Sequence, residues 1–382
     1  MTLKTATRGL VPPFIVMDVM RDAARLEAEG RRIVHLEVGQ PSTGIPVAAA
    51  ARVRELIGRE ALGYTVSAGI PELRERIAAH YRATHGVTIS PEQVFVTTGS
   101  SGGFMLAFLA AFAAGDRVAL AAPGYPAYRH ILTALDAVPE LIEVGADTRY
   151  QPTVEHLKRM KTLPEGLIVA SPSNPTGTVI PKTDFVDLVN FCDQHGIRLI
   201  SDEIYHGLTY GMEVTTAAAE SGSAIVVNSF SKYFSMTGWR LGWLVLPKAM
   251  LRPLECLAQN LFISPPTVSQ WAGVYVFDCR DELEANVARY AANRELLLKR
   301  LPALGFDKLA PADGAFYIYA DVARHTNDAE VFCRRILNEA GVATTPGVDF
   351  DPINGRHFMR FSFAGSTPDM AEACDRLAAW KR

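Results

Sequence analysis

Short apolar runs recur along this chain of 382 residues, separated by longer stretches with helical spacing. Each run is about four residues long and is bounded by turn-forming residues, a pattern typical of buried strands. The runs predict seven strands, at residues 94–97, 118–121, 141–144, 167–170, 198–201, 224–227 and 243–246.

The stretches between these runs predict helices, most clearly at residues 104–113 and 183–195. An alternation of strands and helices is typical of a mostly parallel sheet with helices on both faces, so we expect an α/β fold. Nearer the ends of the chain, the pattern predicts a helix at 16–30, a short strand at 33–38, a long helix at 285–301 and a strand that begins at 314–317.

Composition narrows the classes of function. The length and the 48% hydrophobic content suit about two domains with a large core. The balance of 38 basic and 41 acidic residues gives no charge pattern for nucleic acid or an anionic membrane, which favours small-molecule partners. The five cysteines form no CxxC motif, which argues against a disulfide framework or a metal site and fits the cytoplasm. No signal peptide or membrane anchor is predicted.

One lysine lies where a ligand of such a sheet would bind. The segment SFSKYFSMTGWRLGW follows the predicted strand 224–227, so Lys232 lies on a loop at the carboxyl end of a strand. Hydroxyl side chains, among them Ser229, and the guanidinium of Arg240 suit a phosphate. A lysine among cations and apolar groups has a lowered pKa, and its neutral amine can attack a carbonyl. A solvated lysine beside a salt-bridged arginine is the simpler interpretation of this segment alone.

A second segment has the features of an anion site. The first strand leads through TTGSSGG into an apolar helix, where free backbone amides can bind phosphate oxygens at Ser100, Ser101 and Gly102. The segment has neither the GxGxxG nor the Walker spacing, so a nucleotide site is not indicated. An ordinary serine cap of the helix is the alternative.

Polar side chains follow three more of the predicted strands. Tyr125 in PGYPAY can stack on a flat ligand, and Asn174 in SPSNPTG is held extended by the proline that follows it. Asp202 and Tyr205 lie in SDEIY. A buried carboxylate needs a partner, and a protonated ring nitrogen would serve as one for Asp202. A core tyrosine and a helix-capping aspartate are the alternatives for Tyr125 and Asp202.

Two loop residues are also candidates. Gly39 in LEVGQP marks a turn at which the backbone can approach a ligand closely, or an ordinary loop. Tyr64 in LGYTVSAG lies between glycines, where its hydroxyl can reach a distant partner or its ring can pack on the surface.

Together the strand ends offer an amine, a carboxylate, an amide, an aromatic ring and a phosphate cradle, which suits pyridoxal 5'-phosphate. The motifs SxSNPTG, SDEIY and SFSKxFxMTGWRLGW, in this order, resemble those of the class I and II aminotransferases, enzymes of the aspartate aminotransferase fold type I. The resemblance spans nearly the whole chain. It implies a homodimer in which a seven-stranded, mostly parallel sheet lies between helices in the large domain.

The resemblance also implies a role for each matching residue. Lys232 resembles the Schiff-base lysine, which also moves the proton at the substrate α-carbon. Asp202 resembles the partner of the pyridine nitrogen, which keeps the ring protonated as an electron sink. The implied coenzyme ligands are Ser100, Ser101, Gly102, Tyr125, Asn174, Asp202, Tyr205, Ser229, Lys232 and Arg240, with Tyr64 reaching the phosphate in the partner subunit. No metal is implied.

The C-terminal part of the chain supplies the substrate end of the site. Arg360 in MRFSFA resembles the arginine that binds the substrate α-carboxylate, to which Gly39 and Asn174 would also contribute. A guanidinium suits this task because it pairs with a carboxylate through two hydrogen bonds, although a surface strand arginine is the alternative. We expect an N-terminal arm with part of the small domain at 1–45, a large coenzyme-binding domain at 46–282 and a small α+β domain at 283–382.

The implied reaction is ping-pong transfer of an amino group from an L-amino acid to a 2-oxo acid. Dicarboxylate-specific relatives place a second arginine before an NPP-like element, whereas residues 258–266, AQNLFISPP, include no cation. We therefore expect a neutral or aromatic donor, with 2-oxoglutarate or pyruvate as acceptor. Asp351 stands where the family commonly has a glycine, a departure without a functional interpretation.

Several other functions are open from the sequence. An aspartate-type aminotransferase and a β-eliminating lyase would use the same coenzyme site. A nicotinamide dehydrogenase would need a glycine fingerprint, and a regulator with this fold would need an added DNA-binding module; the sequence shows neither.

Overall fold

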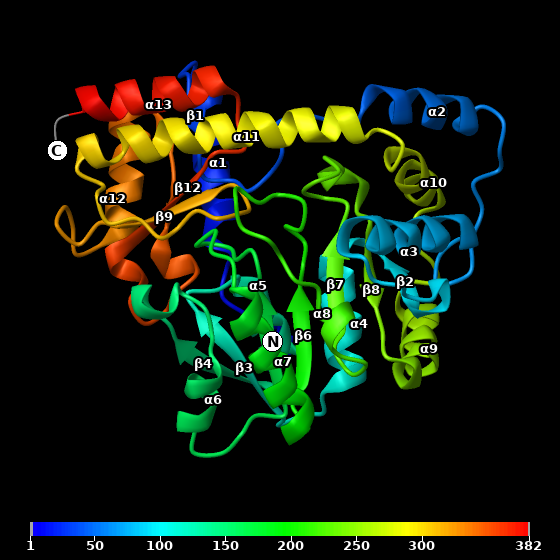
Figure 1. Cartoon of the computed structure of the whole chain (residues 1–382). Helices are drawn as coiled ribbons and strands as arrows, with labels where there is room; N and C mark the ends of the chain where they lie inside the picture. The colour runs from blue at the N-terminus through cyan, green and yellow to red at the C-terminus, as the bar shows by residue number, and fades with distance from the viewer. Residues whose placement is uncertain (1–2, 381–382) are drawn as a thin grey trace.

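The computed structural model describes residues 3–380 and contains, within that range, one large sheet and two smaller ones (Figure 1). The large sheet has seven strands in the order β2-β8-β7-β6-β5-β3-β4. The smaller sheets have the orders β11-β12-β9 and β1-β10. No helix in the described range combines the length and the apolar character needed to span a bilayer.

All seven strands predicted from the apolar runs are present in the large sheet, which confirms the α/β fold. Their bounds are Val94–Thr97 (β2), Arg117–Ala122 (β3), Val138–Glu143 (β4), Gly166–Ala170 (β5), Arg198–Asp202 (β6), Ile225–Ser229 (β7) and Gly242–Val245 (β8). Only β8 runs antiparallel to its neighbours, β2 and β7, so the sheet is mostly parallel as predicted.

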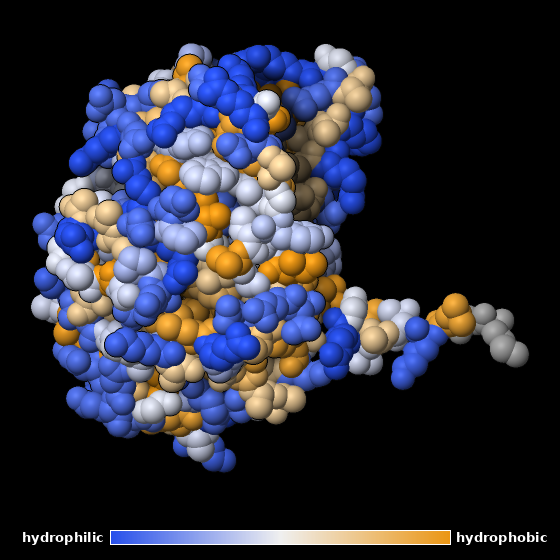
Figure 2. All heavy atoms as spheres, turned by 90° about the vertical axis from the view of Figure 1, so that its right-hand side faces the viewer, coloured by the Kyte–Doolittle hydropathy of each residue, from blue (hydrophilic) through white to orange (hydrophobic). Residues whose placement is uncertain are grey.

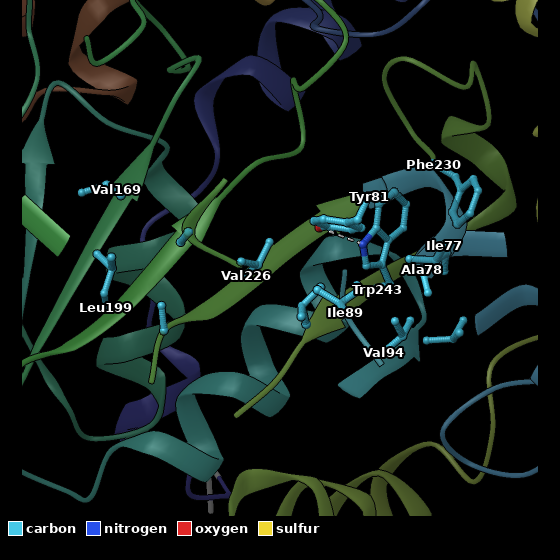
Figure 3. Close-up of a cluster of buried hydrophobic side chains, with 14 of the residues drawn as sticks. Ile77, Ala78, Tyr81, Ile89, Val94, Val169, Leu199, Val226, Phe230 and Trp243 are labelled. Atoms are coloured by element: carbon cyan, nitrogen blue, oxygen red, sulfur yellow. Dashed lines mark hydrogen bonds between the residues drawn. The ribbon is translucent and has the colours of Figure 1, made fainter. Parts of the chain in front are cut away.

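Helices cover both faces of this sheet, so β2, β7 and β8 are buried along their whole length. Helices α3 (Pro71–His85) and α7 (Lys182–His195) pack on one face. Figure 3 shows this core, in which the indole of Trp243 donates a hydrogen bond of 3.3 Å to the hydroxyl of Tyr81. The other face packs against α4 (Gly99–Ala111), α5 (Pro126–Ala134) and α9 (Leu251–Leu261). The remaining helices of this region are α2 (Val47–Ile57), α6 (Val154–Arg159), α8 (Ala217–Glu220) and α10 (Thr267–Val276).

The two smaller sheets bring distant parts of the chain together. β1 (Val34–His35) pairs in parallel with β10 (Val342–Ala343), and β12 (Phe358–Ser362) pairs antiparallel with β11 (Thr345–Pro346) and β9 (Tyr317–Asp321). Helices α1 (Ile15–Ala28), α12 (Ala329–Arg335) and α13 (Thr367–Ala379) belong to this region.

Helix α11 (Arg280–Arg300) runs from the large sheet to the smaller ones (Figure 1). Leu283 near its start belongs to a core of the large sheet, whereas Tyr290 and Leu297 belong to the core around β9 and β12. The boundary predicted at residue 283 thus falls inside a continuous helix, and the domain limits remain a prediction.

Two local predictions differ from the structure, and Asp351, which had no interpretation from the sequence, has a structural one. Helix α4 begins at Gly99 rather than at residue 104, so the serines and glycines of TTGSSGG form its first turn. The strand predicted at 33–38 is limited to β1: the backbone of Leu36 still bonds to Ala343, but the chain bends at Glu37 and the pairing ends there. Asp351 is buried, and its carboxylate accepts hydrogen bonds of 2.8 and 3.0 Å from the N–H groups of Ile353 and Asn354, which gives it a turn-closing role.

Candidate active site

The predicted site residues meet at one edge of the large sheet. β5, β6 and β7 are parallel neighbours, so their carboxyl ends open on the same side. Asp202 ends β6, and Asn174 and Lys232 lie in the loops that follow β5 and β7. The segment around Gly39 and strand β12 with Arg360 complete the arrangement from the other side, through the contacts given below.

Lys232 is partly buried, and its Nζ donates a hydrogen bond of 2.6 Å to the carbonyl oxygen of Gly39. The Nζ lies 5.6 Å from the centre of the Tyr205 ring and 5.8 Å from that of Phe316. Burial, together with the charge of Arg360, lowers the pKa of the Lys232 amine to about 8. An appreciable fraction of the amine is therefore neutral near physiological pH, as a nucleophile or proton carrier requires.

Asp202 is buried, and its carboxylate has two donors. The hydroxyl of Tyr128 donates to Oδ2, and the N–H of Ile204 donates to Oδ1 at 3.1 Å. Burial raises the pKa of Asp202 to about 6, although both donors and the charge of Lys232 oppose the rise. The carboxylate closes the following turn through Oδ1, as the capping alternative proposed, while Oδ2 is bound by the hydroxyl of Tyr128.

Arg360 is 2% exposed, so it is not a surface arginine. Its guanidinium lies between the rings of Tyr317 and Phe350, 4.4 and 4.6 Å from their centres. Nη1 donates a hydrogen bond of 2.7 Å to Oδ1 of Asn174, and Nη2 donates to the carbonyl oxygen of Glu37. Nε is buried and makes no hydrogen bond among residues 3–380, so the group retains a donor for a ligand.

Tyr317 contacts both Tyr205, which follows β6, and Gly39, in the N-terminal segment. Its hydroxyl lies 2.7 Å from the hydroxyl of Tyr205. A Cβ atom at Gly39 would stand 1.7 Å from the Tyr317 oxygen, so a side chain at position 39 would displace that hydroxyl. Glycine at this position is therefore required by the close approach of the backbone to Tyr317, whereas the approach to a ligand that LEVGQP indicated stays a prediction.

The N-terminus of α4 and Arg240 form a corner that suits an anion. Gly99 has a φ of +75°, and a Cβ atom there would stand 2.6 Å from Nη2 of Arg240. The N-cap residue, Thr98, makes no side-chain cap, so the amides of the first turn are not used by a capping group. Ser100 is partly exposed and Ser101 is exposed in that turn, where a phosphate would meet amides, hydroxyls and a guanidinium.

The other predicted ligands near this corner are already engaged within the protein. Gly102 packs on Thr98, with a Cβ-to-Oγ1 distance of 2.4 Å if a side chain were added. The hydroxyl of Ser229 donates to the carbonyl of Leu241 at 3.2 Å and lies 2.9 Å from Oγ of Ser231. Ser229 therefore shapes the Lys232 loop, whatever ligand it also contacts.

Tyr125 is the N-cap residue of α5 and lies in the same neighbourhood. Its ring packs edge to face against Phe14 and Tyr128, at 5.8 and 5.3 Å between ring centres. Burial raises the pKa of Tyr125 to about 12, with a further contribution from the nearby hydroxyl of Tyr317 and the charge of Asp202. The residue thus lies within electrostatic range of the site.

Tyr64 is the one predicted residue that lies outside this cluster, because its side chain is 85% exposed on the loop between α2 and α3. A cavity of about 690 Å³ opens beside Arg240 and is lined by residues 40–45, 235, 237–240, 266, 268 and 269. It gives the edge of the sheet an opening to solvent on the side of Arg240.

Three further residues, Tyr128, Glu37 and Tyr317, contact the predicted site residues and were not predicted as part of the site. Tyr128 lies three positions after Tyr125 on α5, so helical spacing places both on one side and could have indicated it. Glu37 acts through its backbone carbonyl and Tyr317 through a contact with Gly39, and neither has a recognisable sequence signal.

Taken together, these groups suit a ligand with a phosphate, a flat ring with a basic nitrogen, and a carbonyl that an amine can attack. The phosphate would lie at the α4 corner, the ring nitrogen at Asp202 and the carbonyl near Lys232. The buried guanidinium of Arg360 would bind the carboxylate of a second molecule.

Comparisons with known proteins agree with this chemistry. The family model described as aminotransferase class I and II matches residues 31–377. The valine–pyruvate aminotransferase of Mycobacterium tuberculosis is 50% identical over 384 residues, covering 100% of this chain and 99% of that protein. The crystal structure of an aminotransferase from Mycobacterium tuberculosis has a TM-score of 0.98 and 49% identity over 99% of both chains. The structure of aspartate aminotransferase from Thermus thermophilus with maleate has a TM-score of 0.93 and 31% identity over 99% of this chain and 100% of that one.

Proposed function

The chain belongs to the class I and II aminotransferase family, and from that membership we propose that it transfers the amino group of a neutral L-amino acid to a 2-oxo acid with pyridoxal phosphate as its coenzyme. The observation that carries the proposal is the meeting of a partly buried amine, a buried carboxylate and a buried guanidinium at one edge of the sheet. Each of these groups has a matching part in the coenzyme or in an amino acid.

The residues present fit the coenzyme. Arg240 and the first turn of α4, with Ser100, Ser101 and Gly102, would hold its phosphate, Asp202 its ring nitrogen and Lys232 its aldehyde group. Tyr125 would stack on the ring, Asn174 and Tyr205 would donate to its phenolic oxygen, and Ser229 would support the phosphate end. When bound, the coenzyme supplies an electron-withdrawing ring that stabilises the negative charge developing at the substrate α-carbon.

Lys232 would move the proton at the α-carbon. Its lowered pKa allows the amine to accept a proton and return it near neutral pH. Arg360 would bind the α-carboxylate, and its position between two aromatic rings fixes the plane of the guanidinium and therefore that of the carboxylate. Asn174, hydrogen-bonded to Arg360, would orient the guanidinium from the side of the large sheet.

Two features support a neutral donor. Residues 258–266 include no arginine or lysine that could bind a second carboxylate. The relative from Mycobacterium tuberculosis that is 50% identical is named for valine and pyruvate. We therefore propose branched aliphatic amino acids as the preferred donors, followed by aromatic ones. As acceptor we propose pyruvate first and 2-oxoglutarate second.

A half-reaction assay tests this order. The purified enzyme loaded with pyridoxal phosphate is mixed with single amino acids, and the absorbance change of the coenzyme is followed. We expect valine and other neutral donors to convert the coenzyme faster than aspartate does. A preference for aspartate of more than about tenfold, or about 1.4 kcal/mol of barrier, contradicts the neutral-donor proposal.

We further propose that the enzyme is a homodimer in which Tyr64 reaches the phosphate site of the partner subunit. Exposed apolar side chains surround this loop, namely Val66, Leu261 and Ile263, and the loop contacts the segment after α9 through the hydrogen bond from Ser67 to Ile263. Figure 2 views the side of α2, α9 and α10, where hydrophobic residues are interspersed with hydrophilic ones and the N-terminal arm of exposed residues 3–13 extends to the right.

Mixing of two inactive variants tests the shared site. Lys232→Ala and Tyr64→Ala subunits are unfolded together, refolded and assayed. A shared site predicts that mixed dimers regain activity at one of their two sites, about a quarter of the wild-type value for random pairing. A monomer in sedimentation analysis, or no recovery in confirmed mixed dimers, rejects the proposal.

A further inference from the structure

The segment of residues 36–39 binds two cations of the candidate site, Arg360 and Lys232. The carbonyl of Glu37 accepts from Arg360, and the carbonyl of Gly39 accepts from Lys232 at 2.6 Å. Because the two carbonyls are only two residues apart in one segment, a shift of the segment moves the acceptors of both cations. What fixes this segment therefore affects the alignment of the site.

Hydrogen bonds fix the segment at its backbone. The N–H of Leu36 donates to Ala343 at 2.9 Å, and the carbonyl of Leu36 accepts from Ser362 at 2.7 Å. The hydroxyl of Thr345 donates to the carbonyl of Glu37 at 2.8 Å, beside Arg360.

The side chain of Glu37 is an unexpected part of this arrangement, since it is a carboxylate that is 1% exposed. Its Oε1 lies 2.8 Å from Nδ1 of His35, and its Oε2 is buried with no hydrogen-bond partner in the described part of the chain. His35 is its only charged partner there, and an unpaired buried carboxylate would be costly.

The contacts of His35 define its charge. Nδ1 faces Glu37, and Nε2 lies 3.1 Å from Oε1 of Glu27 on α1. A carboxylate oxygen accepts hydrogen bonds, so an imidazolium ring, which carries hydrogen on both nitrogens, suits the positions of Glu27 and Glu37. In agreement, the hydrogen bond to Glu37, together with Glu27, raises the pKa of His35 to about 9.

We propose that His35 and Glu37 form a positioning pair for Arg360, in which the imidazolium fixes the buried carboxylate and thereby the peptide carbonyl to which the arginine is hydrogen-bonded. The inference rests on the proposed role of Arg360 as the ligand of the substrate carboxylate. It assigns to the pair an effect on carboxylate binding, because neither residue reaches the coenzyme ligands at Asp202 or Arg240.

Substitutions at Glu37 and His35 test the pair in the loaded enzyme. We expect Glu37→Ala to raise KM for both donor and acceptor about tenfold, equivalent to about 1.4 kcal/mol, with kcat within about twofold of wild type. The dissociation constant of a non-reacting carboxylate, 3-methylbutanoate, measured by calorimetry, should rise by the same factor. The affinity for pyridoxal phosphate should not change. Glu29→Ala, at the exposed C-cap of α1, is the matched control, since among residues 3–380 its side chain pairs only with Arg25.

His35→Gln provides a second variant at a partly exposed position, which tests the pair even where Glu37→Ala does not fold. The affinity of wild-type enzyme for 3-methylbutanoate should fall as pH rises through about 9, when His35 loses its proton, whereas the variant should show weaker binding without this fall. The comparison of wild type with variant isolates His35 from Lys232, which titrates in both. The other charged groups near β1 are already paired: Arg32 with Asp369 and Glu372, and Arg376 with Glu372.

The outcomes separate this inference from the proposed function. A large rise in KM for Arg360→Lys with wild-type KM values for Glu37→Ala and His35→Gln would refute the positioning pair alone. A decrease in kcat or in coenzyme affinity without a change in KM would also refute it, because that is the signature of a general structural role. Unchanged KM values in the Arg360 variant as well would refute the proposed role of Arg360.

Discussion

Asp202 provides a prediction that links the chemistry of the site to stability. Burial raises the pKa of this carboxyl from 3.8 to about 6, so between these pH values the native protein binds more protons than the unfolded chain. The free energy of unfolding must therefore fall as pH rises through this window. The size of the effect follows from the two pKa values and is about 3 kcal/mol.

The substitution Asp202→Asn tests this pH dependence of the free energy of unfolding, because it removes the titrating group but keeps the shape of the side chain. In coenzyme-free protein, urea denaturation between about pH 4 and pH 8 should show the variant gaining up to about 3 kcal/mol relative to wild type as pH rises. Asp187→Asn, at an exposed position on α7, is the matched control and should give a curve parallel to wild type. Bound pyridoxal phosphate should reduce the difference by stabilising wild type more than Asp202→Asn, because its ring nitrogen would supply the missing cation.

Parallel curves for wild type and Asp202→Asn, or a gain of the variant at low pH, would refute the reasoning. The first result would mean that the carboxylate is not destabilised by burial. The second would mean that it has a strong cationic partner in the coenzyme-free protein.

Three further predictions concern activity. Lys232→Arg should lower kcat by about 10⁴-fold or more and should give no borohydride-trapped coenzyme, because a guanidinium stays charged; a trapped adduct would contradict the role of Lys232. Tyr128→Phe removes a donor to Asp202, so the acid limb of the pH profile of kcat/KM should move to higher pH. At neutral pH, the variant should lose about 1.5–3 kcal/mol of transition-state stabilisation. An unchanged pH profile would contradict this role of Tyr128. Gly39→Ala should lower kcat/KM about a hundredfold, because the new Cβ would stand 1.7 Å from the hydroxyl oxygen and 2.6 Å from the Cζ atom of Tyr317; an unchanged kcat/KM would contradict this cause.

The fold was largely predictable because a parallel sheet buries its strands on both faces, and seven continuous apolar runs give a strong signal. The elements that differed are controlled by other forces. Helix α4 begins in a glycine- and serine-rich turn that has poor helix propensity but follows directly from β2. β1 is shorter than the predicted strand, since the carbonyl of Glu37 after it accepts a hydrogen bond from Arg360 instead of pairing with a strand.

The site was predictable where chemistry depends on side chains that follow strands, as at Lys232, Asp202 and Asn174. It was not predictable where backbone groups act, since any residue at position 37 would supply a carbonyl to Arg360. The buried Glu37 also lay outside the prediction, because no sequence signal distinguishes a carboxylate that is buried beside His35 from an exposed one.

The pairing of β1 with β10 has a consequence for how the enzyme is made. The carbonyl of Glu37 and the guanidinium of Arg360 are 323 positions apart, yet they are hydrogen-bonded. During synthesis, the segment with Glu37 must stay unpaired until the ribosome has made the segment with Arg360. The proposed carboxylate site around Arg360 is therefore among the last features to form. The nascent enzyme can thus assemble most of its large sheet well before it is able to recognise an amino acid.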